Sequence, residues 1–209
     1  MGCNNAAAAN TQEGKKTTDE KPNIVFVVGG PGCGKGTQCK KLISKYGYVS
    51  FSTGDLMRKY VEEKKEGWED LKKTMDEGQL VSSQTLMKIL KEYLVTSKNK
   101  KILVDGYPRN QENIDEWEKQ MKNEVNVKAA LYFELSNEEM KKRILGRKEG
   151  RSDDNEATIA KRLETFEKQT KPIVSYFEKK NILIKIDGSK SVDEVHADVC
   201  KAFEEKGLN

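Results

Sequence analysis

The amino-acid sequence predicts an α/β domain in which a parallel five-stranded sheet carries helices on both faces. Short apolar segments alternate with longer segments whose apolar residues recur at helical spacing, which is typical of a parallel sheet. A glycine-rich loop lies directly between the first apolar segment, 24–28, and the first helical one. The length of 209 residues is enough for one domain with small insertions and a sizeable core.

The individual elements follow from local signals along the chain. Ser52 and Ser136 are suited to N-caps because their hydroxyl oxygens can accept from the free N–H groups of a first helical turn. Gly78 marks a helix end, and Pro172, which lacks an N–H group, is expected to break or kink a long helix. We expect strands at 24–28, 48–51, 101–104, 129–135 and 182–186. We expect helices at 34–45, 53–64, 67–78, 82–96, 136–145 and 155–179, another around 114–121, and a last one from 191.

The first 21 residues differ in composition from the rest. They are small and polar and cannot bury enough apolar surface to fold, so we expect a disordered arm at 1–21 before one domain at 22–209. The opening Met-Gly-Cys provides Gly2, which N-myristoylation requires, and Cys3, a thiol for a second acyl chain. Ala6 stands where the acylation pattern prefers serine or threonine, so a plain flexible tail with an incidental thiol is the alternative.

Composition and charge exclude several classes of protein. The 38 basic and 34 acidic residues leave a formal net charge of +4, too small and too interspersed to indicate a nucleic-acid partner. The four cysteines form no C-x-x-C pair, so we expect no disulfide or zinc framework and a cytoplasmic location, with membrane association only through Gly2 and Cys3. No apolar run approaches the ~18 residues of a membrane span, and no secretory signal is recognisable. The single histidine, His196, lies in a late amphipathic helix, so chemistry must proceed without a histidine base.

The glycine-rich loop is the strongest functional signal. Residues 29–35 match the G-x-x-x-x-G-K core of a phosphate-binding loop, although Gly36 displaces the expected serine or threonine to Thr37. Glycines let successive N–H groups turn toward one point, the following helix directs its positive end there, and Lys35 adds a full charge. The loop therefore predicts a site for the phosphates of a nucleotide, with a simple glycine-rich turn as the alternative. We expect contacts from Gly30, Pro31, Gly32, Cys33, Gly34, Lys35, Gly36 and Thr37.

Arginines are few, so their positions are informative. Several adjoin turns or loops near the predicted carboxyl edge of the sheet: Arg58, Arg109, Arg147, Arg151 and Arg162. An arginine holds two phosphate oxygens with a rigid fork and stays charged, so this set can gather two phosphorylated molecules. The alternative for each is an ordinary surface ion pair, for example with Asp153 or Asp154. Arg143, in the middle of a predicted helix, is expected to be a scaffold residue.

Four motifs give the chain a family resemblance. They are Gly29-Gly-Pro-Gly-Cys-Gly-Lys-Gly-Thr37, Ser52-Thr-Gly-Asp-Leu-Met-Arg58, Asp105-Gly-Tyr-Pro-Arg109 and Gly150-Arg-Ser-Asp-Asp-Asn155. With these motifs in this order, residues 22–206 resemble the nucleoside monophosphate kinases, and among them the short-lid branch of adenylate kinases and UMP-CMP kinases. The chain departs from that pattern at Cys33, where serine or alanine is usual, and in a shorter lid. The resemblance implies the three-layer P-loop NTPase fold with an acceptor-binding insert at about 52–82 and a lid at about 146–156.

The resemblance also implies a reaction, in which the γ-phosphoryl group of Mg-ATP passes to the phosphate of a nucleoside monophosphate. It assigns catalysis to Lys35, Arg109, Arg147, Arg151 and Arg162. It assigns donor binding to the glycine-rich loop and Arg147, and a water-mediated contact with the Mg²⁺ cofactor to Asp105. It assigns acceptor binding to Thr53, Arg58, Gly106, Arg109, Asn113, Arg151 and Arg162. An acceptor phosphate is already an anionic nucleophile, so catalysis reduces to positioning, charge neutralisation and exclusion of water.

Two residues give opposite indications of which base the acceptor nucleotide carries. In the family, the position of Asn113 contacts the base, and asparagine there resembles UMP-CMP kinases, whereas adenylate kinases carry glutamine. Thr53 resembles the adenylate kinases, since pyrimidine enzymes usually carry alanine. The runs Pro108–Trp117, Thr170–Pro172 and Lys185–Val192 also resemble the UMP-CMP kinases. We therefore expect a monomeric UMP-CMP kinase that serves pyrimidine biosynthesis, with an adenylate kinase as the alternative. Remoter alternatives are a catalytically inactive nucleotide-binding module and a membrane-attached nucleotide switch, although the sequence lacks the guanine-reading Asn-Lys-x-Asp motif.

Overall fold

The sheet is parallel and five-stranded, as the sequence predicts. The computed structural model describes residues 21–146 and 153–209, so the predicted acylation at Gly2 and Cys3 and the lid residues Arg147 and Arg151 lie outside the described residues. Along the sheet the strands follow the order β2-β3-β1-β4-β5, and every neighbouring pair is parallel. The strands are β1 (Asn23–Gly29), β2 (Val49–Ser52), β3 (Lys101–Asp105), β4 (Asn126–Glu134) and β5 (Leu183–Asp187).

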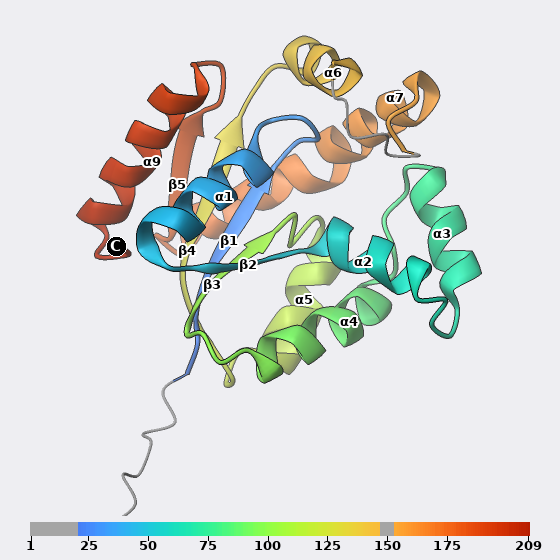
Figure 1. Ribbon diagram of the computed structural model, residues 1–209, viewed down its shortest axis with the longest axis horizontal. Helices are drawn as coiled ribbons and strands as arrows, with labels where there is room; N and C mark the ends of the chain where they lie inside the picture. The colour runs from blue at the N-terminus through green and yellow to red at the C-terminus, as the bar shows by residue number, and fades with distance from the viewer. Residues whose placement is uncertain (1–20, 147–152) are drawn as a thin grey trace, which may run out of the picture.

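Helices connect the strands and cover both faces of the sheet (Figure 1). The α-helices are α1 (Lys35–Tyr46), α2 (Thr53–Glu62), α3 (Trp68–Asp76), α4 (Ser83–Thr96), α5 (Gln111–Gln120), α6 (Asn137–Leu145), α7 (Glu156–Thr165), α8 (Val174–Lys179) and α9 (Val192–Glu205). Ser52 and Ser136 accept hydrogen bonds from the backbone N–H groups of Asp55 and Glu139, which confirms both predicted N-caps. Within residues 21–146 and 153–209, every helix is too short or too polar to cross a lipid bilayer.

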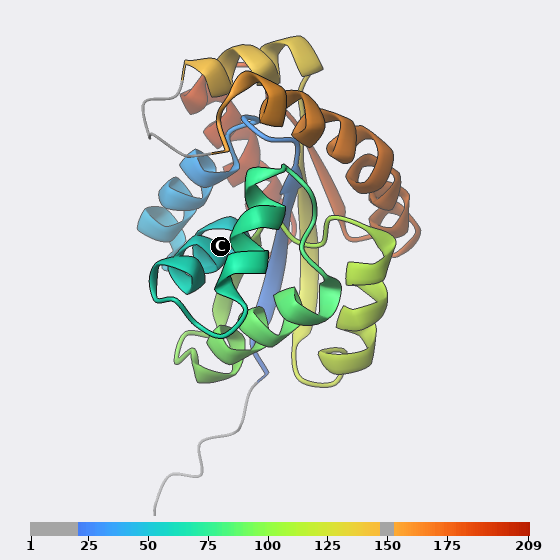
Figure 2. The ribbon, with the colours of Figure 1, turned by 90° about the vertical axis from the view of Figure 1, so that its right-hand side faces the viewer.

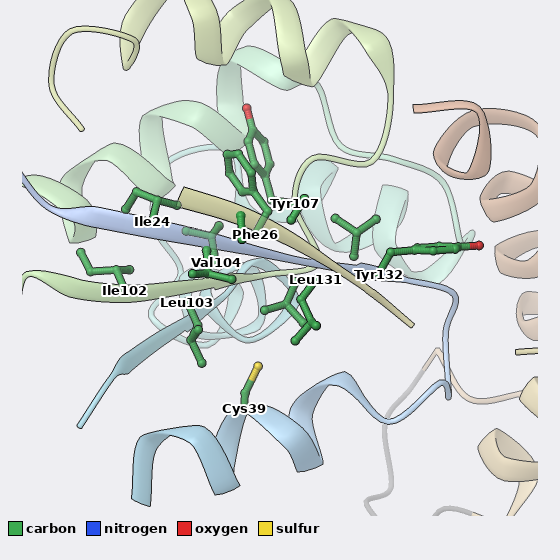
Figure 3. Close-up of a cluster of buried hydrophobic side chains, with 14 of the residues drawn as sticks. Ile24, Phe26, Cys39, Ile102, Leu103, Val104, Tyr107, Leu131 and Tyr132 are labelled. Atoms are coloured by element: carbon green, nitrogen blue, oxygen red, sulfur yellow. The ribbon is translucent and has the colours of Figure 1, made fainter. Parts of the chain in front are cut away.

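The core lies on both sides of the central strand β1. Ile24, Val25 and Val27 are fully buried, and a continuous apolar run of this kind is what a strand covered on both faces requires. On one face, the Phe26 ring lies 4.8 Å from the Trp117 ring of α5 in an edge-to-face arrangement. Figure 3 shows Cys39 of α1 on the opposite side of the sheet from Phe26. The two cores hold β1 rigidly, so the loop that follows it starts from a fixed point.

The order of the strands determines where a ligand site can form. The chain passes from β1 to one side of the sheet through β2 and β3 and to the other side through β4 and β5. In such a sheet the crevice lies beyond the carboxyl end of the strand at which the order reverses, here β1. The insert formed by α2 and α3 extends from this edge, with α7 above it in Figure 2.

The long helix predicted at 155–179 is interrupted earlier than the proline alone suggests. α7 ends at Thr165, a π-helical segment η1 (Phe166–Thr170) follows, and a short 3₁₀ segment η2 (Lys171–Ile173) contains Pro172. The backbone N–H of Lys171 donates to the carbonyl oxygen of Phe166, which widens the helix just before the proline. The predicted break in the long helix is therefore confirmed, but the α-helix already ends at Thr165, and a π-helical turn separates it from the proline.

Candidate active site

A pocket of about 740 Å³ lies at the carboxyl edge of the sheet, where the strand order predicts a ligand site. It is bounded by the glycine-rich loop, the insert, the 105–109 turn and the segment around α7 and η1. Among the residues that line it are Lys35, Arg58, Asp105, Gly106, Arg109 and Arg162, all of them sequence-predicted. Four segments that are distant in the chain therefore meet around one concave surface.

The glycine-rich loop has a geometry that only glycine adopts readily. Gly32 and Gly34 have φ values of +78° and +97°. A Cβ atom on Gly32 would lie 2.8 Å from the backbone oxygen of Met140 and 2.8 Å from a side-chain carbon of Ile144. The loop is therefore pressed against α6, and its peptide groups line the pocket from Pro31 through Thr37, apart from Cys33.

Two predicted loop contacts lie behind the pocket surface. Gly30 is buried, and a Cβ there would lie 2.1 Å from the sulfur of Met140. Cys33 is 2 % exposed and packs against Gly29 inside the loop. Side-chain contact between Cys33 and a nucleotide therefore does not fit this geometry, and the residue instead fills the interior of the loop.

The amino group of Lys35 lies across the mouth of the loop. Its Nζ donates to the carbonyl oxygens of Gly29 and Gly30 at 2.8 and 2.7 Å. Carbonyl oxygens are weaker partners for an ammonium group than phosphate oxygens are, so this charge is poised to exchange them for an anion.

Arg109 is fixed at the opposite wall by hydrogen bonds on both its side chain and its backbone. Its Nε donates to the Gly106 carbonyl oxygen at 2.7 Å, and its Nη2 donates to Thr53 Oγ1 at 3.3 Å. Its carbonyl oxygen accepts from Thr170 Oγ1 of η1 at 2.7 Å. Burial lowers the pKa of Arg109, and repulsion from Arg162 lowers it further. A bound anion would relieve that repulsion.

Asn113 does not line the pocket, although the family resemblance places it against the acceptor base. The residue is 1 % exposed. Its Nδ2 donates to Ser83 Oγ at 2.6 Å, and its Oδ1 accepts from the backbone N–H of Arg109 at 3.0 Å. Asn113 therefore joins α4 to the 105–109 turn and, in this conformation, does not reach the pocket surface.

The remaining described arginines are held by acidic neighbours. Arg58 pairs with Asp55 across the first turn of α2, at the pocket wall. Arg162 Nη1 lies 3.0 Å from Asp153 Oδ2 and 2.9 Å from Asp154 Oδ1, so the predicted ion pairs do form. Both arginines also line the pocket. Each can therefore pair with its acidic neighbour and still face a phosphate group in the pocket.

The structure adds pocket residues that the sequence analysis missed. Arg143, expected to be a scaffold residue, does pair with Glu139, but its Nη1 also donates to the Gly188 carbonyl oxygen at 2.9 Å. Through this contact with the turn after β5 it reaches the pocket, together with Lys190 and Val192. The available signal was topological, since the segment after β5 must end at the same sheet edge as the glycine-rich loop.

Asp105 has the chemistry of a Mg²⁺ partner. It is the last residue of β3, and it pairs in register with Val27 of β1, two residues before the loop begins. Among residues 21–146 and 153–209, no cluster of three or more metal-binding side chains occurs. One carboxylate fits Mg²⁺, because this ion is commonly held by one or two carboxylates, water and the phosphates of a substrate.

The insert and α7 touch each other directly. Thr158 Oγ1 of α7 donates to the carbonyl oxygen of Asp76 at 3.0 Å. A Cβ on Gly78 would lie 3.1–3.2 Å from atoms of Thr158 and Arg162. The predicted helix end at Gly78 thus lies in direct contact with α7.

Comparison with known proteins agrees with this geometry. The adenylate kinase family model matches residues 27–182. The chain is 44 % identical over 190 residues to UMP-CMP kinase 1 of Oryza sativa subsp. japonica, covering 91 % of this chain and 75 % of that protein. It is 41 % identical to the UMP-CMP kinase of Rattus norvegicus, covering 90 % of this chain and 100 % of that protein. It is 43 % identical to human adenylate kinase isoenzyme 1, covering 87 % and 94 %. The chain therefore belongs to the adenylate kinase family.

Proposed function

We propose that this protein is a nucleoside monophosphate kinase that transfers the γ-phosphoryl group of Mg-ATP to UMP or CMP. The observation that carries the proposal is the convergence of Lys35, Arg58, Arg109 and Arg162 on one pocket from four separate segments. A single phosphate needs fewer fixed cations than this. Two phosphorylated molecules placed end to end account for all four charges.

The donor nucleotide occupies the side of the pocket formed by the glycine-rich loop. The N–H groups of the loop and the first turn of α1 receive its phosphates, and Lys35 exchanges its carbonyl partners for phosphate oxygens. Asp105 would hold Mg²⁺ through water, and the ion would neutralise charge on the phosphates. Arg143 and Lys190 extend this side of the pocket beyond the loop, and the flat guanidinium of Arg143 is suited to stacking on a base.

The acceptor nucleotide occupies the side formed by the insert and the 105–109 turn. Arg58 and Arg109 hold its phosphate, and the buried Thr53 hydroxyl shapes the corner beside Gly106. The phosphate itself is the nucleophile, so no base is required. His196 is accordingly remote from the pocket and contacts Gln38 and Cys200 between α1 and α9.

The choice of pyrimidine rests on Asn113 and on similarity. Relatives named UMP-CMP kinase and adenylate kinase are almost equally similar, at 39–44 % and 43 % identity. Asn113 is buried behind the pocket, so its contribution to this choice is the resemblance of an asparagine at this position to the UMP-CMP kinases. Adenylate kinase remains the second candidate, favoured by the threonine at position 53.

A substrate panel tests the proposal. We expect ADP formation from Mg-ATP with UMP and CMP to exceed that with AMP, measured as steady-state kcat/KM alongside dCMP. A preference for AMP of tenfold or more would replace the pyrimidine assignment with adenylate kinase. Turnover that stays at zero with every monophosphate would remove the kinase assignment altogether. Excess EDTA should abolish the rate, and added Mg²⁺ should restore it.

A further inference from the structure

A second pocket, of about 440 Å³, lies at the end of the sheet opposite the active site. It is lined by Asn23, Tyr48, Lys101, Lys128, Lys206, Gly207, Leu208 and Asn209. These residues lie at or next to the amino ends of β1, β2, β3 and β4 and just after α9. The nucleotide site proposed above does not use this surface.

Lysines gather on this surface because three chain segments meet there. The backbone N–H of Asn23 donates to the carbonyl oxygen of Lys100 at 2.7 Å, and that of Asn126 donates to Pro22 at 2.8 Å. These bonds bring Lys21 and Lys100 to the same edge as Lys128. We call Lys21, Lys100, Lys128 and Lys206 the lysine end. All four are exposed.

The charges of the lysine end are open to an external partner. Within the described parts of the chain, none of its four amino groups lies within 4.0 Å of a carboxylate side chain, whereas Lys72, Lys168 and Lys190 all do. The acidic residues next to these lysines in the sequence are Asp19, Glu20, Glu124, Glu204 and Glu205, and among the described ones Glu204 pairs with Lys45 instead. The half-buried Lys101 is turned inward, with its Nζ 3.2 Å from a backbone oxygen of Asn209.

The N-terminal 20 residues join the folded domain at the lysine end, through Lys21. A chain of 20 residues can span at most about 70 Å. A lipid attached near its start would therefore keep the domain within reach of a membrane surface. One such lipid gives only marginal binding, and a basic patch is one of the two-signal combinations that makes attachment stable.

We propose that Gly2 carries an N-linked fatty acyl chain and that the lysine end docks on an anionic lipid bilayer. In the modification, the amino group of Gly2 attacks the carbonyl carbon of an acyl thioester after removal of Met1. An amide bond forms, the thioester bond breaks, and the thiol leaves with the proton. Docking through the lysine end leaves the active-site pocket, at the other edge of the sheet, facing away from the membrane.

The test measures partitioning of the full-length, Gly2-acylated protein into vesicles by co-sedimentation. Neutral phosphatidylcholine vesicles are compared with vesicles in which about one third of the lipid is phosphatidylserine. The test variant combines Lys100→Gln, Lys128→Gln and Lys206→Gln. The matched control combines Lys73→Gln, Lys88→Gln and Lys142→Gln, which removes the same charge from exposed positions on α3, α4 and α6.

We expect anionic vesicles to bind the wild-type protein much more strongly than neutral ones. At about fivefold per lysine, the test variant should partition about a hundredfold more weakly, while the control changes less than about threefold. Equal losses in the two variants, or equal wild-type binding to both vesicle types, would overturn the docking surface. An unmodified Gly2 in the intact mass of the protein from its native cell would overturn the acylation.

The proposal stays testable if the test variant fails to fold, which its melting temperature and kinase rate would reveal. Raising the salt concentration from 0.1 M to 1 M shortens the screening length from about 10 Å to about 3 Å. Wild-type protein should then leave anionic vesicles almost to the level of neutral ones. Retention at high salt would contradict docking by the lysine end.

Discussion

Replacing Gly32 by alanine tests the geometry of the phosphate-binding loop. The residue has a φ of +78°, and a Cβ there would lie 2.8 Å from the backbone oxygen of Met140. The backbone oxygen cannot swing aside as the tip of a side chain can. The loop must therefore move away from α6, which carries its N–H groups away from the phosphates.

The expected loss of stability has two parts. A left-handed conformation is about 1–2 kcal/mol less favourable for alanine than for glycine, and forcing extra volume into a packed contact adds about 1–3 kcal/mol. Gly32→Ala should therefore reduce the free energy of unfolding by about 2–5 kcal/mol. This is a large share of the roughly 5–15 kcal/mol that stabilises a typical domain.

Two neighbouring glycines provide matched controls. Gly34 has a φ of +97° but no atom within 4 Å of a built Cβ, so Gly34→Ala should lose only the conformational part, about 1–2 kcal/mol. Gly36 also has open space around it and lies in the first turn of α1, without a positive φ. Gly36→Ala should leave stability unchanged or raise it by up to about 1 kcal/mol, because alanine favours a helix.

Urea unfolding followed by circular dichroism measures all three variants, and ATP affinity is measured on the folded samples by calorimetry. We expect the order of stability Gly36→Ala, Gly34→Ala, Gly32→Ala, with the weakest ATP binding in the last. If Gly36→Ala destabilises as much as Gly32→Ala, the contact with α6 does not determine the shape of the loop.

Three further predictions concern single side chains. Lys35→Met should lower kcat by about 10²–10³-fold and change the free energy of unfolding by about 1 kcal/mol or less. An unchanged kcat in folded protein would refute the role of this charge. Asn113→Ala removes the buried hydrogen-bond partners of the Ser83 hydroxyl and of the Arg109 backbone N–H. Urea unfolding should therefore show a decrease of about 2–6 kcal/mol in the free energy of unfolding, and a decrease below about 1 kcal/mol would show that water replaces the amide. Desolvation and repulsion from two lysines of α1 lower the pKa of His196 below its usual 6.5, so the fold favours the neutral ring. The neutral ring therefore stabilises the folded state above pH 6.5, and this contribution is lost as the pH falls through the folded-state pKa. Between pH 7 and pH 5, the melting temperature of His196→Gln should fall less than that of the wild-type protein.

Local sequence patterns were sufficient for the elements whose signals are local. The apolar run before Gly29, the N-caps Ser52 and Ser136 and the helix end at Gly78 each depend on a few neighbouring residues. Parallel strand order then places the loop and the 105–109 turn at one edge. The main site residues on these two segments were predictable for that reason.

Contacts across long stretches of chain were not predictable in the same way. Asn113 is buried with its amide nitrogen donating to the hydroxyl oxygen of Ser83, 30 residues earlier. No local pattern specifies that pairing. Arg143 reaches the pocket through Gly188, 45 residues later, although its own helix made it look like a scaffold residue. The π-helical turn before Pro172 was not predicted either; Phe166 and Thr170, at its two ends, are both buried.

The hydrogen bond from Thr158 to the Asp76 carbonyl has a mechanical consequence. The insert and α7 lie on the two sides of the pocket, and this contact ties them together at their tips. An outward movement of the insert to admit an acceptor would either break this bond or pull α7 with it. If the bond holds, the movement also displaces the segment that carries Arg162; if it breaks, opening loses one hydrogen bond, about 0.5–1.5 kcal/mol.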